Sequence, residues 1–152
     1  MEYSLEDFQE NDIFPIGIRT SMEPHQLAYQ LNQKMDAVFR RKQKDIQIAE
    51  KAIFSHFEWE DTTRDIRCHI LANHCWVEDN TVKNSLNLFE LSPSKKVSLI
   101  PEFEMIDFFI VQEDWDQTSR FLTAFQNIAA IEMSQVIENS KHRELFNFVW
   151  TY

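Results

Sequence analysis

Two carboxylates, Glu102 and Asp107, are the residues of this sequence that most directly suggest chemistry. Asp107 stands inside an apolar run, where a carboxylate must be hydrogen-bonded or paired with a cation, or its pKa rises. One interpretation is a general acid and base, or a pair of ligands. In one straight strand the two side chains would point to opposite faces about 17 Å apart, so a shared site requires a bend. The alternative is structural: each carboxylate holds a loop or pairs with an arginine.

A second group of possible ligands lies between Cys68 and Cys75, where His69 and His74 bring the number of potential zinc ligands to four. Zinc needs its ligands to converge tetrahedrally at about 2.0–2.3 Å. A single strand would hold the two cysteines about 23 Å apart, and the CxxC spacing typical of zinc sites is absent. We therefore expect alternating core and surface positions here, no metal site and no cofactor.

One dense basic cluster is a candidate for binding a phosphate, an acidic partner or a short piece of RNA. It consists of Arg40, Arg41, Lys42 and Lys44. The whole chain, however, has 15 basic against 25 acidic residues and a net charge of −10. Such a chain repels nucleic-acid backbones and anionic membrane surfaces. We therefore expect no nucleic-acid partner, and the simpler interpretation of the cluster is a solvated connection.

The single glycine, Gly17, excludes the glycine-rich nucleotide-binding loops. Both the P-loop and the dinucleotide fingerprint use several glycines for tight turns and close approach to phosphate. No serine lies in a Gly-x-Ser-x-Gly elbow, so the sequence indicates no catalytic nucleophile. Trp59 and Trp115 each stand in an acidic run. An exposed indole there would suggest a partner surface, although a solvated acidic rim is the simpler interpretation.

Two amphipathic helices must help to position these residues. In the first, Leu27, Leu31 and Met35 recur every four residues, which is the spacing of one helix face. The spacing of residues 20–23 predicts a capping box at its start. Asp116 is expected to cap the second helix, whose apolar positions are Phe121, Leu122, Phe125, Ile128 and Ala129.

Runs of β-branched and aromatic residues predict the strands. The run 105–112 is apolar except at Asp107 and is expected to be a central strand buried on both faces. Pro15 cannot donate to a ladder, so its strand should lie at a sheet edge or start near this residue. The other predicted segments are strands at 13–19, 53–59, 66–76 and 130–134, a long loop at 79–98 and an apolar tail at 145–148.

The order of these elements predicts an α+β domain. We expect a two-layer sandwich, in which a mostly antiparallel sheet carries two helices on one face. The 152 residues suit a single domain over 1–152, with the acidic residues 1–12 as a flexible arm. An apolar content of 43% with 13 phenylalanines argues against disorder.

The expected location is the cytoplasm, without membrane association. Two cysteines are too few for a disulfide framework. The acidic N-terminus lacks the basic and apolar regions of a signal peptide. No apolar run approaches the 18 or more residues of a membrane span.

One stretch resembles the signature of a known family. The motif of the IPExxxVDY family of Bacteroidetes-type bacteria is matched here by Ile100, Pro101, Glu102, Ile106, Asp107 and Phe108. Because Phe108 lacks a phenol, any chemistry of the family's tyrosine hydroxyl could not be repeated here. The resemblance extends over nearly the whole chain, although only this motif is specific. It implies a small cytoplasmic bacterial protein without an established activity, so no catalytic residues follow from it.

Three functions are consistent with these observations. The first is a non-enzymatic protein-interaction module that binds an unknown protein partner or forms a homodimer, with the motif residues as a possible interaction site. The second is a small-molecule-binding protein or enzyme that uses Glu102 and Asp107. The third is local RNA or phosphate binding through residues 40–44.

Overall fold

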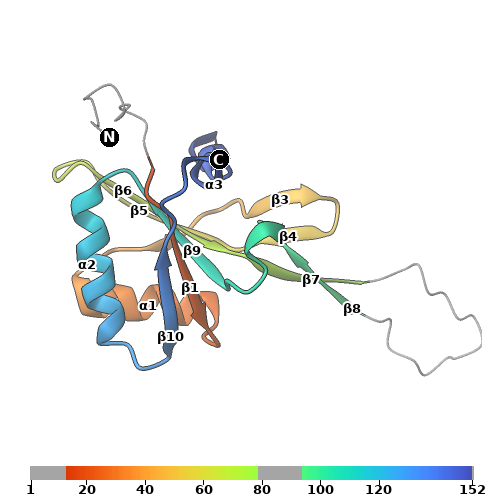
Figure 1. The fold of residues 1–152 in the computed structure, drawn as a ribbon, viewed down its shortest axis with the longest axis horizontal. Coiled ribbons are helices and arrows are strands. Elements are labelled where there is room, and N and C mark those ends of the chain that lie inside the picture. Colours follow the sequence, from red (N-terminus) through yellow and green to blue (C-terminus); the bar gives the residue numbers. More distant parts are fainter. Residues whose placement is uncertain (1–12, 79–93, 152) are drawn as a thin grey trace, which may run out of the picture.

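The computed structural model describes residues 13–78 and 94–151 (Figure 1). The N-terminal segment 1–12, which was predicted to be flexible, and most of the predicted loop at 79–98 lie outside these residues. The main sheet is antiparallel and has six strands in the order β10-β1-β9-β6-β5-β2. Its strands are β1 (Ile16–Thr20), β2 (Arg40–Arg41), β5 (His56–Asp61), β6 (Ile66–Ala72), β9 (Phe108–Gln112) and β10 (Ile131–Val136).

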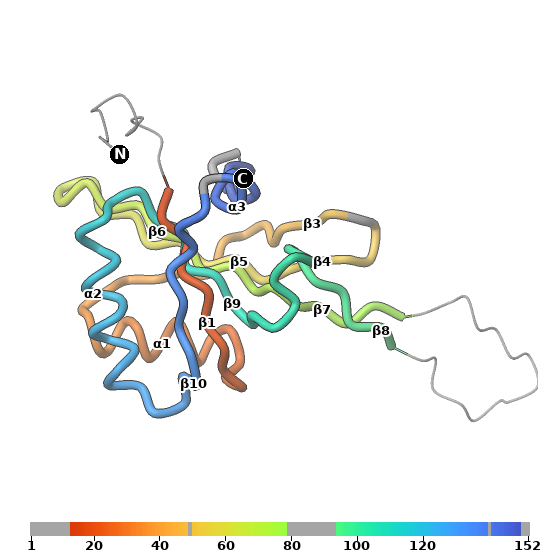
Figure 2. Tube along the Cα trace, in the orientation of Figure 1, coloured from red at the N-terminus to blue at the C-terminus, as the bar shows by residue number. Residues whose placement is uncertain are grey.

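Two further hairpins extend from this sheet. One pairs β3 (Ile46–Ala49) with β4 (Ala52–Phe54), and the other pairs β7 (His74–Glu78) with β8 (Ser94–Ser98). Strands β4 and β7 lie next to each other, and we call the two hairpins together the arm. The arm projects away from the helices (Figure 2). Residues 94–98 were expected in a loop, but they form β8, because Val97 is directed inward and pairs with Cys75.

The predicted fold class is confirmed: α1 (Pro24–Met35) and α2 (Trp115–Gln126) lie together on one face of a mostly antiparallel sheet (Figure 1). Their apolar stripes meet the residues of the sheet that point to the same side. The helix-side core includes Ile16, Ile18, Leu27, Leu31, Phe57, Trp59, Ile70, Ile110, Phe121 and Phe125. The central strand expected over 105–112 is confirmed for its last five residues, which form β9 and are all buried. Residues 105–107 lie in the loop before it, and Met105 is exposed.

The opposite face of the sheet is also covered, as burial of the central strand on both sides requires. A layer on this face was not part of the predicted two-layer sandwich. The cover consists of the β3–β4 hairpin, residues 99–106, α3 (Ser140–Glu144) and η3 (Asn147–Thr151). Phe109 packs edge-on against Phe146 at 4.7 Å in this second core. Alternation along β9 directs Phe109 and Val111 to this side, so they need a cover of their own. The predicted apolar tail supplies part of it.

The N-terminal caps of the two long helices lie two or three residues away from the predicted positions. Helix α1 is capped at Glu23, whose N–H donates to the Gln26 side chain at 2.9 Å. Thr20 instead ends β1, and its hydroxyl donates to the Ala130 carbonyl at 2.7 Å. The cap of α2 is Asp114, whose carboxylate accepts from the Asp116 N–H. In each case another side chain near the predicted position reaches the unpaired N–H groups of the first turn.

Pro15 stands directly before β1, which is an inner strand between β10 and β9. Of the two positions expected for Pro15, the strand start is therefore correct. No helix within residues 13–78 and 94–151 has both the length and the apolar composition that a membrane crossing requires.

Gly17 allows β1 to lie unusually close to the loop that precedes β9. A Cβ atom at this position would be 3.0 Å from Cδ1 of Ile106 and 3.2 Å from two other atoms of the same side chain. Ile106 is buried in the second core and is surrounded by other residues there, so it has little room to move. The glycine is required by this close approach.

Gly17→Ala is therefore expected to lower the free energy of unfolding by about 1–3 kcal/mol through overpacking, measured by urea denaturation. The double variant Gly17→Ala, Ile106→Ala should be less destabilised than the sum of the two single variants, because the contact is then removed from both sides. Strictly additive losses would contradict the proposed contact.

Candidate functional site

Most of the motif residues lie in the loop that connects β8 to β9. Strands β6 and β7 are separated only by Asn73, and they pair first with β9 and then with β8. The Asn73 N–H donates to the Asp107 carbonyl at 2.9 Å, and its own carbonyl accepts from the Leu99 N–H at 2.7 Å. Both ends of the segment 99–107 are therefore hydrogen-bonded to the backbone of the same residue, Asn73, and the residues between them loop out from the sheet. We call this segment the motif loop.

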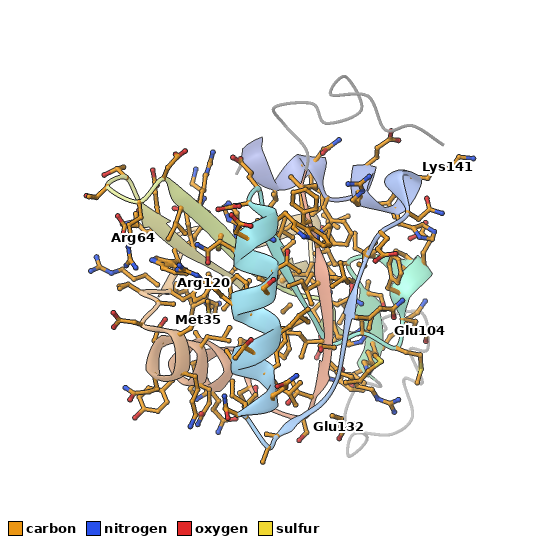
Figure 3. All side chains as sticks on the ribbon, turned by 60° about the vertical axis from the view of Figure 1, so that its left-hand side comes forward. Met35, Arg64, Glu104, Arg120, Glu132 and Lys141 are labelled. Atoms are coloured by element: carbon orange, nitrogen blue, oxygen red, sulfur yellow. The ribbon has the colours of Figure 1, made fainter. Side chains whose placement is uncertain are left out.

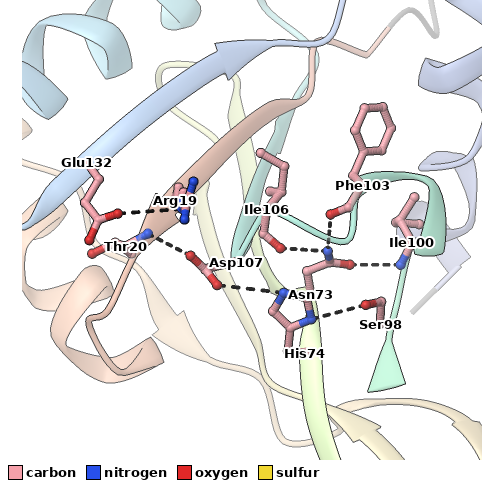
Figure 4. Close-up of polar contacts among 10 residues, drawn as sticks. All are labelled: Arg19, Thr20, Asn73, His74, Ser98, Ile100, Phe103, Ile106, Asp107 and Glu132. Atoms are coloured by element: carbon pink, nitrogen blue, oxygen red, sulfur yellow. Dashed lines mark hydrogen bonds and ion pairs between the residues drawn. The ribbon is translucent and has the colours of Figure 1, made fainter. Parts of the chain in front are cut away.

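The side chain of Asn73 closes the motif loop (Figure 4). Its Oδ1 accepts from the Ile100 N–H at 2.9 Å. Its Nδ2 donates to the carbonyls of Phe103 at 2.9 Å and Ile106 at 2.8 Å. Asn73 is fully buried, so these bonds satisfy backbone groups that water does not reach. The sequence analysis missed this residue, because an asparagine within a strand-like run has no local pattern that indicates such a role.

Most motif residues are used in folding. Ile100 and Ile106 are buried in the second core, and Phe108 is buried in the helix-side core. Pro101 begins the 3-10 helix η2 (Pro101–Phe103), and it is exposed together with Glu102. Glu102 is thus the one acidic motif residue that faces solvent.

Asp107 has a structural role of the kind that the sequence analysis weighed for it. Its Oδ2 accepts from the Thr20 N–H at 2.9 Å, and its backbone N–H donates to the Ile18 carbonyl at 2.8 Å. These bonds tie the end of β1 to the motif loop. Within the described part of the chain, no hydrogen bond or ion pair joins Asp107 to Glu102. The two carboxylates are therefore not in direct contact.

The neighbour of Asp107 is instead His74, whose Nε2 lies 3.7 Å from Oδ1 (Figure 4). On its other side, His74 Nδ1 lies 3.2 Å from the hydroxyl of Ser98. Serine, histidine and aspartate in a row suggest nucleophilic catalysis. However, the distance of 3.7 Å is longer than a hydrogen bond. Burial, reinforced by nearby Lys96, lowers the pKa of His74. The row connects the base of β7 and β8 to the motif loop.

Two of the four cations of the basic cluster, Arg41 and Lys42, lie against acidic neighbours, whereas Arg40 and Lys44 are exposed. Arg41 forms an ion pair with Asp45 and lies over the ring of Phe57 at 5.9 Å. Lys42 Nζ lies 3.6 Å from Glu58 Oε2. Arg40 and Arg41 form the short edge strand β2. Lys95 and Lys96, two further basic residues, lie on β8 in another sheet, so they do not continue the basic cluster along the edge strand β2.

Two histidines form a buried polar contact on the face opposite the helices. Nε2 of His56 and Nδ1 of His69 are 2.8 Å apart, and both side chains are fully buried. One ring donates and the other accepts, so at least the accepting ring is neutral. Burial lowers the pKa of His56 to about 4 and that of His69 to about 3, and Lys42 adds to both shifts.

The two cysteines lie in different surroundings. Cys68 is in the helix-side core, where burial raises the pKa of its thiol. Cys75 lies on β7 against the second core. Within the described ranges, no group of three or more histidine, cysteine, aspartate or glutamate side chains is placed to hold a metal ion.

The tryptophans differ sharply in exposure. Trp59 is 2% exposed and packs edge-on against Phe39, so it cannot form a partner surface. Trp115 is exposed, and one side of its ring lies against Phe14 at 5.2 Å. Trp76, on the arm, is 68% exposed. The sequence analysis did not single out Trp76, because its exposure depends on the arm extending beyond the helices.

The fold and this site define an α+β sandwich whose motif loop is held by a buried amide. Comparison with protein-family models, curated proteins and solved structures found no match to the chain. The resemblance to the IPExxxVDY family stays a prediction.

Asn73→Ala is expected to lower the free energy of unfolding by about 2–4 kcal/mol, because it leaves buried backbone groups of the motif loop without partners. Asn127→Ala is a matched control, since the Asn127 amide also donates to a carbonyl but at an exposed helix end. The control should change stability by less than about 0.5 kcal/mol. Equal effects of the two substitutions in urea denaturation would refute the role given to Asn73.

The buried histidine pair is expected to make stability depend on pH. The unfolded chain takes up these protons near pH 6.5, whereas the native pair takes them up only near 4 and 3. The free energy of unfolding should therefore fall as the pH drops from 7 towards 4, by about 1.4 kcal/mol per pH unit for each histidine. Replacing both residues with leucine should flatten this slope, while the exposed His25→Gln should retain it. An unchanged slope in the double variant would contradict the prediction.

Proposed function

We propose that this chain is a non-enzymatic protein-interaction module that binds a protein partner through the outer face of the arm. The observation that carries the proposal is an exposed apolar surface on two neighbouring strands. Trp76 on β7 is 68% exposed and Ile53 on β4 is 48% exposed. An aromatic anchor with an aliphatic neighbour is the usual centre of a binding interface.

Strand alternation explains why these side chains are free. Ala52 and Phe54, on either side of Ile53, are buried in the second core. Cys75 and Val77, on either side of Trp76, pack against the same core. Ile53 and Trp76 therefore point away from it. The described helices α1 and α2 pack on the main sheet and do not bury them.

The charge next to this surface favours an acidic partner. Lys96 is paired directly with Trp76 across β7 and β8, so the two side chains lie on the same face of the hairpin. Lys96 is exposed, although the chain as a whole is strongly acidic. A partner with an apolar pocket and a carboxylate beside it would match the indole and this lysine together. Glu102, as the exposed acidic residue of the motif, is a separate candidate contact.

The two other functions have less support. An enzyme using Glu102 and Asp107 would need both carboxylates in one site, whereas one faces solvent and the other holds β1. RNA or phosphate binding through residues 40–44 would compete with Asp45 and Glu58. Location in the bacterial cytoplasm and membership of the IPExxxVDY family belong to this proposal as predictions.

A photo-crosslinking amino acid at position 76 is expected to capture a specific protein in native lysate. The matched control is position 29, since Tyr29 on α1 is an aromatic side chain with a similar exposure of 60%. With the captured partner purified, Trp76→Ala should weaken binding by about thirtyfold, the effect of a 2 kcal/mol hot spot, and Tyr29→Ala should leave it unchanged. The same capture at both positions, or equal affinities of both alanine variants, would reject the arm as the binding surface.

A further inference from the structure

Strand β10 is an open sheet edge of unusual character. It is the last of the described strands in the order β10-β1-β9-β6-β5-β2, and only β1 pairs with it. It forms the margin of the sheet beside β1 in Figure 3, where Glu132 is labelled near its start. The opposite edge, β2, has only two residues, both arginines. β2 is thus short and charged, as edges protected against further pairing usually are, whereas β10 has six residues.

The hydrogen-bond phase of β10 shows which groups face outward. Ile137 N–H donates to the Pro15 carbonyl, so these two residues form a bonded pair. Bonded and non-bonded pairs alternate along an antiparallel ladder. With the observed register, the next bonded pairs are Gln135 with Gly17 and Met133 with Arg19. The backbone groups of Ser134 and Val136 therefore point away from β1.

The sequence of β10 lacks the usual protection of an edge strand. It contains no proline and no lysine, and its one charged residue is Glu132. The charge of Glu132 is partly compensated by Arg19 of β1, at 3.6 Å. The register shift between Arg19 and Thr20 leaves Glu132 without a partner on β1, so the pairing with β1 is regular from Met133 to Val136. Met133 adds an exposed apolar side chain.

We propose that β10 pairs antiparallel with β10 of a second copy of this chain, with Ser134 on the two-fold axis. An antiparallel edge is self-complementary, because the same outward N–H and C=O groups serve both copies. In this register Glu132 lies opposite Val136, and Met133 lies opposite Gln135. If the register were shifted so that Gln135 lay on the two-fold axis, Glu132 would instead lie opposite Glu138. Like charges directly opposite each other are destabilising. The dimer joins two six-stranded sheets into one and leaves the arm free, so it does not depend on the function proposed above.

Sedimentation equilibrium over a dilution series tests this proposal. The wild-type chain should reach twice the monomer mass. Ser134→Pro removes an outward N–H from each copy but none of the bonds between β1 and β10, so it should raise the dimer dissociation constant by about tenfold or more. Ser134→Ala keeps the N–H and should dimerise like wild type. Ser134→Lys places two like charges on the axis and should also dissociate the dimer, which gives a second test if the proline variant fails to fold.

The register can be tested separately by crosslinking. Ser134→Cys should form a disulfide between copies under mild oxidation, because directly opposite residues are within disulfide reach. Gln135→Cys should not, because residues 135 of the two copies are offset along the strands. A monomeric wild type, or a dimer that survives both Ser134→Pro and Ser134→Lys in folded chains, would overturn the proposal. Loss of arm binding would leave this result unaffected, and the reverse also holds.

Discussion

The hydrogen bonds of Asn73 are the interaction on which the arrangement of this chain most depends. Its backbone continues the ladder from β9 to β8, and its side chain binds three backbone groups of the motif loop. One continuous strand can therefore have two successive partners, with nine residues between them folded into a compact turn. The turn places Ile106 over Gly17 and brings Asp107 to the end of β1. Without the amide, the backbone groups of the loop would be buried without partners, which costs more than the hydrogen bonds contribute when made.

The two faces of the sheet differ in the kind of side chains that are buried against them. The helix face is closed by two amphipathic helices over an apolar surface, and its buried charge is minimal. The other face combines an apolar cluster with a histidine pair, and Glu58, which pairs with Lys42, lies 3.7 Å from His69. Burial keeps the two imidazoles neutral, so the pair resembles an ordinary buried hydrogen bond near neutral pH. Acid adds positive charge to this buried pair, and burial penalises that charge despite the nearby Glu58, so this face is the more sensitive of the two to pH.

Local pattern was sufficient for much of the fold and for little of the site. Leu27 and Leu31 identified α1, and the apolar run around Phe109 identified the central strand, because periodicity and hydrophobicity are local properties. Strand β8 could not be recognised, since residues 94–96 are polar and exposed and only Val97 packs inward. Asn73 and His74 could not be assigned because their partners are 24 to 33 residues away. Asp107 was correctly considered as a residue that ties down a loop, whereas its partner, the Thr20 N–H, followed from no sequence signal.

The fate of the motif residues limits where function can lie. Ile100, Ile106 and Phe108 are in the cores, and Asp107 is engaged by β1, so four of the six positions are accounted for by folding. In this structure the motif residues build a turn, and a sequence motif does not by itself mark a catalytic centre. Among the described residues, two surfaces that folding leaves unused are the apolar outer face of the arm and the edge of β10, with which β1 is the one described strand that pairs. Both suit contacts with other protein chains. The motif loop aligns β8 with β7, and this alignment places Lys96 beside Trp76. The motif residues therefore affect the geometry of the arm although they lie outside it.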